Sequence, residues 1–203
     1  SELMSNLASS LVSVLYNFRL MALAGENGVA AYGVIMYVNF IFAAIFMGYA
    51  IGSAPVVGYH YGAEHHDELK SLLGKSLRLV AVAGLVLTAL SELLARPLTQ
   101  IFVGYDPELW AFTCHGFQLY SLSFLFSGFN VFGSSFFTAL NNGLVSAGIS
   151  FSRTLLFQVA AVLLLPLVLG VDGIWLAITV AELLCLLVTV SCLVKLRGRY
   201  HYA

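Results

Sequence analysis

Long apolar stretches follow one another along almost the whole chain, and this feature constrains the fold more than any other. A helix that crosses the roughly 30 Å hydrocarbon core of a bilayer needs about 20 mostly apolar residues, because each backbone polar group must be bonded within the segment. By this rule the sequence predicts six transmembrane helices. They cover approximately residues 3–24, 29–59, 69–94, 109–140, 144–169 and 174–194.

The composition is typical of a protein that lies in lipid. Hydrophobic residues make up 60% of the chain and charged residues only 9%, whereas an ordinary soluble domain carries about 25% charged residues. A soluble fold of this size could not bury so much apolar surface. The formal net charge of −1, with no dense basic patch, gives no support to nucleic-acid binding.

The breaks between the apolar stretches are short and contain turn-forming residues. Glycine, asparagine, aspartate and proline predominate in them, and connections this tight make consecutive helices antiparallel neighbours. We therefore predict an all-α membrane protein in which residues 1–203 form a single six-helix lobe. The predicted breaks lie at residues 25–28, 62–67, 104–107, 141–143 and 170–173.

Two of the predicted helices are too long for one straight crossing, so they are expected to tilt, bend or protrude. Pro55 and Gly58 mark an irregular end of the second helix. In the fourth helix, the glycine and serine residues of 127–130 and 133–135 would allow a bend or close packing.

The positions of the cations predict the orientation, because short loops rich in lysine and arginine stay in the cytoplasm. We expect the loop after the second helix, the turn at 141–143 and both termini to be cytoplasmic. Arg19 and Arg96 lie towards the opposite side. The cations assigned to the cytoplasmic side are Lys70, Lys75, Arg78, Arg153, Lys195, Arg197 and Arg199.

Ionisable side chains within the apolar stretches are costly, and Glu182 is the most deeply placed. It has no cation within a helical turn, so it must be protonated, pair with another helix or face water. It is a candidate coupling residue that carries a proton, or alternatively a neutral carboxyl that bonds between helices. Arg153 is expected to extend from near a helix end to the headgroups. Glu92 and Arg96, spaced i, i+4, are expected to pair.

Uncharged polar residues form a stripe on the fourth predicted helix. Positions i, i+3, i+7 and i+10 share one face, which must meet either a partner helix or a watery cavity. Phe129, Phe132 and Phe136 lie nearby and could line a pocket for amphipathic aromatic cations, although simple helix packing remains an alternative. The candidate cleft residues, which include three from the first two helices, are Asn17, Tyr37, Asn39, Tyr120, Ser123, Ser127 and Asn130.

The sequence carries no pattern typical of an enzyme, a metal site or a cofactor site. His60, His65 and His66 lack the HExxH spacing and a nearby cysteine, so we expect solvated side chains. The cysteines lie in apolar runs and are predicted to be buried thiols. There is no P-loop or dinucleotide fingerprint. An intramembrane enzyme would need a paired nucleophile and base or a metal, and His115 alone supplies neither.

The run 54–63, Ala-Pro-Val-Val-Gly-Tyr-His-Tyr-Gly-Ala, leads from the second helix into a basic loop. It resembles the Pro…Gly-Ala signature of the multidrug and toxic compound extrusion (MATE) family. Residues 15–17, 134–143 and 173–177 are also similar to that family. The order and spacing of these segments match helices seven to twelve of a twelve-helix transporter. The opening at Ser1, without an initiator methionine, is likewise what a fragment would show.

The resemblance implies a cation-coupled antiporter that exports organic cations and amphipathic drugs across the cytoplasmic membrane. It also implies that the first, second and fourth helices line a cleft faced by a missing amino-terminal lobe of six helices. Sodium-coupled members carry acidic residues at positions that look like Asn6 and Asn130. Because asparagine supplies no full negative charge, the resemblance favours a proton over sodium as coupling ion. Coupling would then reside mostly in the missing half, with Glu182 as the exception.

A flippase or exporter of lipid-linked precursors, or of other amphipathic anionic substrates, is the alternative reading. Arg19 and Arg153 would be its natural anion contacts. A drug antiporter and a lipid exporter of related architecture share the short loops and the polar stripe, so half a transporter does not separate them.

Overall fold

The computed structural model describes the backbone of residues 2–202 and the side chains of residues 8–202. Helices occupy nearly all of this range, and no β-strand occurs within it. The predicted all-α class is therefore confirmed. The elements are α1 (Glu2–Gly62), α2 (His66–Val103), α3 (Pro107–Ser121), α4 (Phe124–Ala139), α5 (Gly143–Phe151), the π-helix η1 (Ser152–Gln158), α6 (Val159–Leu169) and α7 (Val171–Tyr200).

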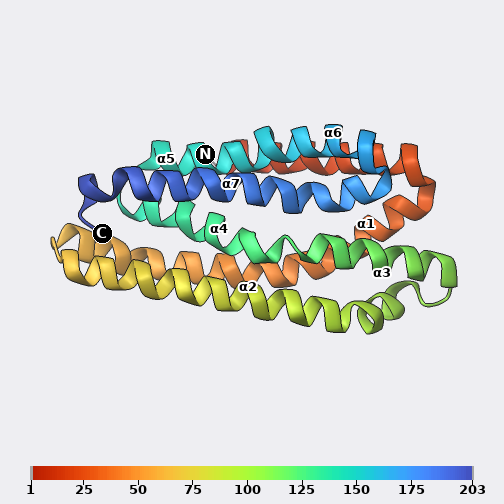
Figure 1. Ribbon diagram of the computed structural model, residues 1–203, viewed down its shortest axis with the longest axis horizontal. Helices are drawn as coiled ribbons and strands as arrows, with labels where there is room; N and C mark the ends of the chain where they lie inside the picture. Colours follow the sequence, from red (N-terminus) through yellow and green to blue (C-terminus); the bar gives the residue numbers. More distant parts are fainter. Residues whose placement is uncertain (1, 203) are drawn as a thin grey trace.

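The long element α1 consists of two helices that meet at Gly25. A straight helix of 61 residues would measure about 90 Å, three times the thickness of a bilayer core. Gly25 instead has φ 62° and ψ −150°, a conformation that residues with a Cβ rarely adopt. Figure 1 shows the first half of α1 running to one end of the molecule and the second half returning from it.

Six membrane-crossing segments result from this division. Four helical stretches are each long and apolar enough to cross a membrane, and the α3–α4 pair, bent by 46°, makes a fifth. The turn at Gly25 divides α1 into two crossings, which gives the sixth. The segment from α5 through η1 to α6 is one continuous crossing.

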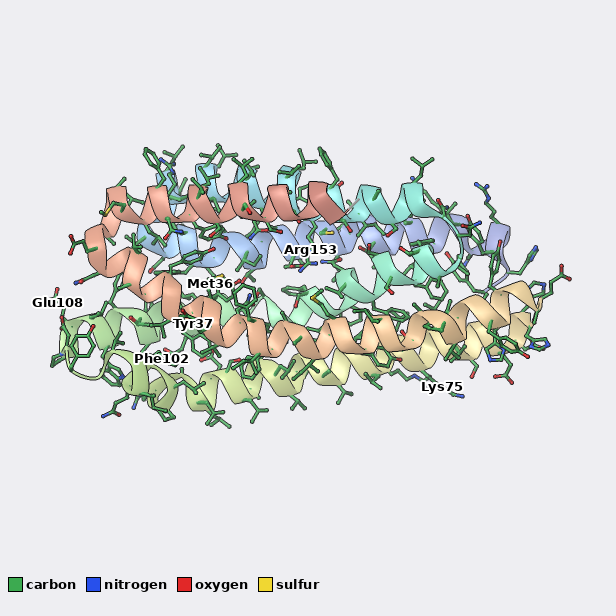
Figure 2. All side chains as sticks on the ribbon, turned by 180° about the vertical axis from the view of Figure 1, so that it is seen from behind. Met36, Tyr37, Lys75, Phe102, Glu108 and Arg153 are labelled. Atoms are coloured by element: carbon green, nitrogen blue, oxygen red, sulfur yellow. The ribbon has the colours of Figure 1, made fainter. Side chains whose placement is uncertain are left out.

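The connections gather at the two ends of an elongated bundle. The turn within α1, the α2–α3 loop and the α6–α7 turn lie at one end of the bundle (Figure 1). The α1–α2 loop, the α4–α5 turn and the carboxy terminus lie at the other end. Figure 2 labels Lys75 near the second end and Glu108 at the first. The loops are thus grouped as the antiparallel prediction requires.

Several helices extend beyond the predicted spans, because a helix does not need to stop at the edge of the lipid. α2 continues to Val103 and α7 to Tyr200. Pro55 and Gly58 do not end the second helix, which continues to Gly62, so that expectation is wrong. Proline is tolerated in membrane helices where neighbouring hydroxyls bond nearby carbonyl groups, and both Ser53 and Ser135 donate to the carbonyl of Ala50.

The bend of the fourth crossing lies at Leu122 and Ser123, between α3 and α4, and not at the glycine-containing segments. Those glycines allow close packing instead. A Cβ on Gly128 would lie 2.6 Å from the ring of Phe46. The start of α3 is explained by its N-cap residue, Asp106. The Asp106 carboxylate accepts hydrogen bonds from the backbone N–H groups of Glu108, at 3.0 Å, and Leu109, at 3.2 Å.

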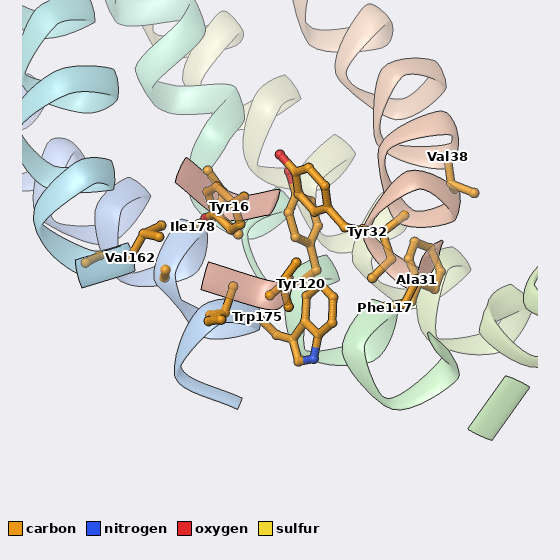
Figure 3. Close-up of a cluster of buried hydrophobic side chains, with 14 of the residues drawn as sticks. Tyr16, Ala31, Tyr32, Val38, Phe117, Tyr120, Val162, Trp175 and Ile178 are labelled. Atoms are coloured by element: carbon orange, nitrogen blue, oxygen red, sulfur yellow. The ribbon is translucent and has the colours of Figure 1, made fainter. Parts of the chain in front are cut away.

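Among the described side chains, the two largest of four hydrophobic clusters join most of the crossings. One joins both halves of α1 to α3, α6 and α7, and Figure 3 shows its aromatic members, Tyr16, Tyr32, Phe117, Tyr120 and Trp175. The other joins α1, α2, α4 and α7 and contains Phe132, Phe136, Phe137, Tyr200 and Tyr202. The outer surface is also apolar, with Val168 83% exposed, as expected for side chains that face lipid.

The contact between α6 and α7 gives a first test of this packing. A Cβ on Gly173 would lie 2.5 Å from the carbonyl carbon and oxygen of Leu165, whereas one on Gly148 would meet nothing within 4 Å. We expect Gly173→Ala to lower the free energy of unfolding by about 1–3 kcal/mol because backbone atoms cannot move aside easily. Gly148→Ala should change it by less than about 0.5 kcal/mol. Thermal unfolding of the detergent-solubilised variants, followed by size exclusion, measures both, and equal midpoints would refute the packing.

Candidate functional site

A cavity of about 780 Å³ lies among the crossings. Its walls come from both halves of α1, from α3 and α4, and from the α5–η1 segment and α7. This size lies within the range of pockets that hold drug-sized molecules. Six of the seven predicted cleft residues line it, namely Asn17, Tyr37, Asn39, Tyr120, Ser123 and Ser127.

The cavity has an aromatic wall that differs from the predicted one. The rings of Tyr16 and Tyr32 stack at 5.1 Å with an angle of 8° between their planes, and both line the cavity. Phe132 and Phe136 do not line the cavity and lie in the second hydrophobic cluster instead. The break between α3 and α4 changes the direction of the fourth crossing, so the stripe could not be extended along one straight helix. The other aromatic lining residues are Tyr37, Phe40, Phe46, Tyr120 and Phe124.

Uncharged polar side chains occupy much of the remaining lining. Asn17 is partly held by a hydrogen bond from its Nδ2 to the carbonyl of Ser13, at 2.9 Å. Tyr37 is 67% exposed and stacks on Phe102, so it lies at the rim. Such a lining can stack on an aromatic molecule and also bond its polar groups. The other polar lining residues include Ser9, Asn39, Ser134, Ser150, Thr154 and Gln158.

Among the lining residues of the described part of the chain, the charged side chains are Arg153 and Glu182, and they form an ion pair. Arg153 Nε donates to Glu182 Oε1 at 2.7 Å. The Glu182 side chain is 1% exposed and that of Arg153 is 31% exposed. Of the three possibilities raised by the sequence for Glu182, pairing with another helix is therefore the one observed.

The position of Arg153 overturns the expectation that it extends to the headgroups. It lies on η1, in the interior of the crossing formed by α5, η1 and α6. Figure 2 shows it about halfway along the bundle, between the two ends. Arg153 therefore does not belong to the group of cations that was assigned to the cytoplasmic side. The nearby carboxylate of Glu182 keeps it inside, since an ion pair lowers the cost of burying either charge.

Asn130 has a different place from the rest of the predicted stripe. It is 1% exposed and does not line the cavity. Its Nδ2 donates to Glu182 Oε2 at 2.7 Å and to the Glu182 carbonyl at 2.8 Å, and its Oδ1 accepts from Thr189 Oγ1 at 2.9 Å. Asn130 thus bonds the carboxylate from outside the cavity lining. Both carboxylate oxygens of Glu182 accept a hydrogen bond, Oε1 from Arg153 and Oε2 from Asn130.

The π-helix η1 positions the charged and polar side chains of this wall. A π-helix has a wider turn than an α-helix, and short π segments frequently occur at functional sites. Within Ser152–Gln158, the side chains of Arg153, Thr154 and Gln158 all line the cavity. Composition and periodicity gave no indication of this segment, because a π turn has no sequence signature comparable to a helix cap.

The remaining ionisable residues of the crossings lie outside the cavity lining. The predicted Glu92–Arg96 pair is wrong, since Glu92 Oε1 accepts from Ser121 Oγ at 2.8 Å, next to the break before α4. Arg19 Nη2 donates to the carbonyl of Leu163. His115 Nε2 lies 2.9 Å from Asp172 Oδ1, and both side chains are more than half exposed.

The sequence also raised the questions of an ion-binding position at Asn6 and of a metal site. The side chain of Asn6 lies outside the described residues. Among the described side chains of residues 8–202, no three or more histidine, cysteine, aspartate or glutamate residues are grouped so that they could hold a metal ion.

The fold and the cavity define a multi-pass helical membrane protein with an internal cleft of drug-sized volume. A family model described as MatE matches residues 3–163. The chain belongs to the MatE family, which confirms the resemblance found in its sequence. No curated protein matches the chain.

Solved structures share the fold at low sequence identity. The bent form of the Vibrio cholerae MATE transporter VcmN superimposes with a TM-score of 0.87 at 20% identity, covering 98% of this chain and 45% of that one. A MOP superfamily transporter from Pyrococcus furiosus gives 0.86 at 19% identity, covering 97% and 44%. An outward-facing multidrug resistance MATE family transporter gives 0.85 at 20% identity, covering 97% and 43%. The chain thus spans less than half the length of these relatives.

Proposed function

We propose that this chain is one lobe of a cation-coupled antiporter that exports organic cations or amphipathic drugs across the cytoplasmic membrane. The observation that carries the proposal is the cavity of about 780 Å³ with aromatic and uncharged polar walls inside a membrane lobe. Family membership and the fold of MATE transporters support it. The proposed contacts of the drug are the predicted cleft residues that line this cavity.

We assign the coupling to a proton, with Glu182 as the proton-carrying residue of this lobe. Its carboxyl group lies at the cavity wall, in the interior of α7, where a change of protonation alters the charge that the cavity contains. Asn130 holds this carboxyl but does not carry a charge of its own, which supports the proton over a sodium ion.

The other partner in this proposal is a second six-helix lobe of the same protein, facing the cavity across the cleft. The end of the bundle with Lys70, Lys75 and the carboxy terminus would face the cytoplasm, because cations are retained there. The amino terminus would be on the same side. Alternating access then results when the two lobes rock against one another around the cleft.

One observation favours a second candidate, the export of anionic amphipathic molecules such as lipid-linked precursors. Arg153 lines the cavity with a side chain that is 31% exposed. Of the two arginines expected to contact an anion, Arg19 does not line the cavity and bonds a backbone carbonyl instead. Any role in anion recognition therefore falls to Arg153.

Export of ethidium by cells that make the complete transporter tests the proposed function. We expect export that stops when the proton gradient is collapsed by an uncoupler. Tyr37→Ala should slow export about fivefold, because stacking of an aromatic substrate is worth roughly 1 kcal/mol. Tyr37 is 67% exposed and its ring contact with Phe102 lies at the rim, so its loss should change the stability of the lobe only slightly.

Tyr105→Ala is the matched control, since Tyr105 is 82% exposed and does not line the cavity. Its export rate should equal that of the unmodified transporter. Ethidium export that continues unchanged without a proton gradient, or no export at all, would contradict the proposed function.

A further inference from the structure

The guanidinium group of Arg153 has unused hydrogen-bond donors at the cavity wall. Arginine carries five N–H donors in a planar fork, and Nε is the donor to Glu182. Within the side chains of residues 8–202, no hydrogen bond from Nη1 or Nη2 of Arg153 is found. The side chain lines the cavity and is 31% exposed. Four donors are therefore left for water or a ligand.

The remaining groups of the network fix this fork in one orientation. Asn130 bonds the carboxylate of Glu182, and Thr189 bonds Asn130, so each member is held by the next. Arg153 itself is part of the helical backbone of η1. A donor group that is already held in place loses little conformational entropy when a ligand binds.

Both partners of the ion pair line the cavity, but the positive partner is the more exposed, at 31% against 1%. Glu182 is 1% exposed and both of its carboxylate oxygens accept hydrogen bonds. Glu182 accepts from the Nε edge of the guanidinium. The two N–H groups at the end of the planar fork, one on each Nη, point away from that edge and can serve a second acceptor. Such an acceptor gains two charge-assisted hydrogen bonds if it is planar or bears two oxygens.

The surroundings of Arg153 indicate which molecules carry that acceptor. The lining residues Thr154 and Gln158 of the same wall offer further polar groups, and Phe40, which lines the cavity and is 68% exposed, offers aromatic surface. Together they suit an aromatic molecule with one acidic group.

We propose that Arg153 forms a subsite for the acidic group of an amphipathic aromatic substrate, a carboxylate or a sulfonate. The inference rests on the proposed function in that it takes the cavity to be the substrate site. It adds the substrate class, aromatic acids and zwitterions, and the residue that recognises their acidic group. The soluble aromatic acid is chosen over a lipid headgroup because seven of the described aromatic side chains line the cavity, and the rings of Tyr37 and Phe40 are 67% and 68% exposed.

Binding of two fluorescent probes with the same ring system and opposite charges tests the subsite. The probes are pyrene-1-sulfonate and pyrene-1-methylammonium, titrated into the purified complete transporter in detergent. The double variant Arg153→Gln/Glu182→Gln removes both charges together and so leaves no buried charge unpaired. We expect its Kd for the sulfonate to rise about tenfold or more, since a bidentate charge-assisted contact is lost. The Kd for the ammonium probe should change less than about twofold.

Arg153→Lys keeps the charge but loses the fork, so its Kd for the sulfonate should lie between those of the unmodified protein and the double variant. Arg197→Gln, far from the cavity on the exposed end of α7, should bind both probes normally. Equal changes for the two probes, or sulfonate binding that does not depend on Arg153, would overturn the subsite. Displacement of the sulfonate by phosphatidylglycerol would overturn its assignment to soluble aromatic acids.

Failure of this proposal is distinguishable from failure of the proposed function. Gradient-driven ethidium export with no sulfonate binding would refute the subsite alone. Sulfonate binding that depends on Arg153, in a transporter that does not export ethidium, would refute the organic-cation function alone.

Discussion

Replacing Arg153 alone by glutamine is expected to lower the free energy of unfolding of the complete transporter by about 3–5 kcal/mol, the largest stability effect in this lobe. Glu182 would remain as a carboxylate that is 1% exposed, without the cation 2.7 Å away. Asn130 would still bond Oε2, but a neutral amide cannot balance a full negative charge. The cost comes from the charge that is left unpaired and not from the loss of one contact.

The double variant Arg153→Gln/Glu182→Gln separates these two causes. It should recover at least half of the lost stability, because replacing both partners of a buried ion pair is often close to neutral. Arg197→Gln removes an exposed cation and should change stability by less than about 0.5 kcal/mol. Thermal unfolding in detergent compares the three variants. A single variant as stable as the double variant would mean that Glu182 is not held as an anion by Arg153.

The crossing segments could be predicted from the sequence because hydrophobic length decides them. Gly25 and Gly170 reverse the chain with positive φ angles of 62° and 60°, at breaks that composition alone located. The residues at which α2 and α7 end could not be predicted as well as the crossings themselves. The mostly apolar residues 95–103 and the basic residues of 195–200 continue α2 and α7 beyond the predicted crossings. No sharp change in hydropathy marks where either helix ends.

The centre of the candidate site could be predicted only in part. Glu182 was identifiable because a carboxyl inside an apolar stretch is costly. Its partner was not, since Arg153 lies 29 residues away on another crossing and helix rotation cannot be read from one sequence. The π turn of η1 also changes the register of side chains on that crossing. Arg153 was therefore expected near a headgroup and is found at the cavity.

The polar stripe of the fourth crossing could also be predicted only in part, because the helix that carries it is broken. A regular 3.6-residue period places Tyr120, Ser127 and Asn130 on one face, but α3 ends at Ser121 and α4 begins at Phe124. After the 46° bend, Ser127 still lines the cavity whereas Asn130 faces Glu182. A helix break inside an apolar stretch has no clear sequence signal here, because Leu122 and Ser123 are common within helices.

The ion pair links substrate recognition to coupling in the proposed mechanism. When Glu182 takes up a proton, its charge is lost while Arg153 remains a cation, so the cavity gains one positive charge. An organic cation is then repelled from the wall, and the fork of Arg153 is left without its counter-charge. The same protonation would strengthen the hold on an acidic group. Substrates of opposite charge should thus respond oppositely to the protonation of one carboxyl group.

Glu182→Gln is expected to reduce proton-driven ethidium export to less than about 10% of the unmodified rate, because glutamine cannot take up and release a proton. The variant should still fold. It leaves Arg153 unpaired, but that side chain is 31% exposed at the cavity, where water can solvate it, unlike the buried carboxylate left by Arg153→Gln. Ethidium binding to the purified protein should therefore persist.

Transport in proteoliposomes with an imposed pH difference measures this effect. The unmodified transporter should accumulate ethidium against its gradient, and the rate for Glu182→Gln should no longer depend on the pH difference. Glu108→Gln is the matched control, since Glu108 is an exposed acidic residue at the end of the bundle (Figure 2). If Glu182→Gln and Glu108→Gln both transport as fast as the unmodified protein, the carboxyl of Glu182 has no part in coupling, and the proton must bind in the facing lobe.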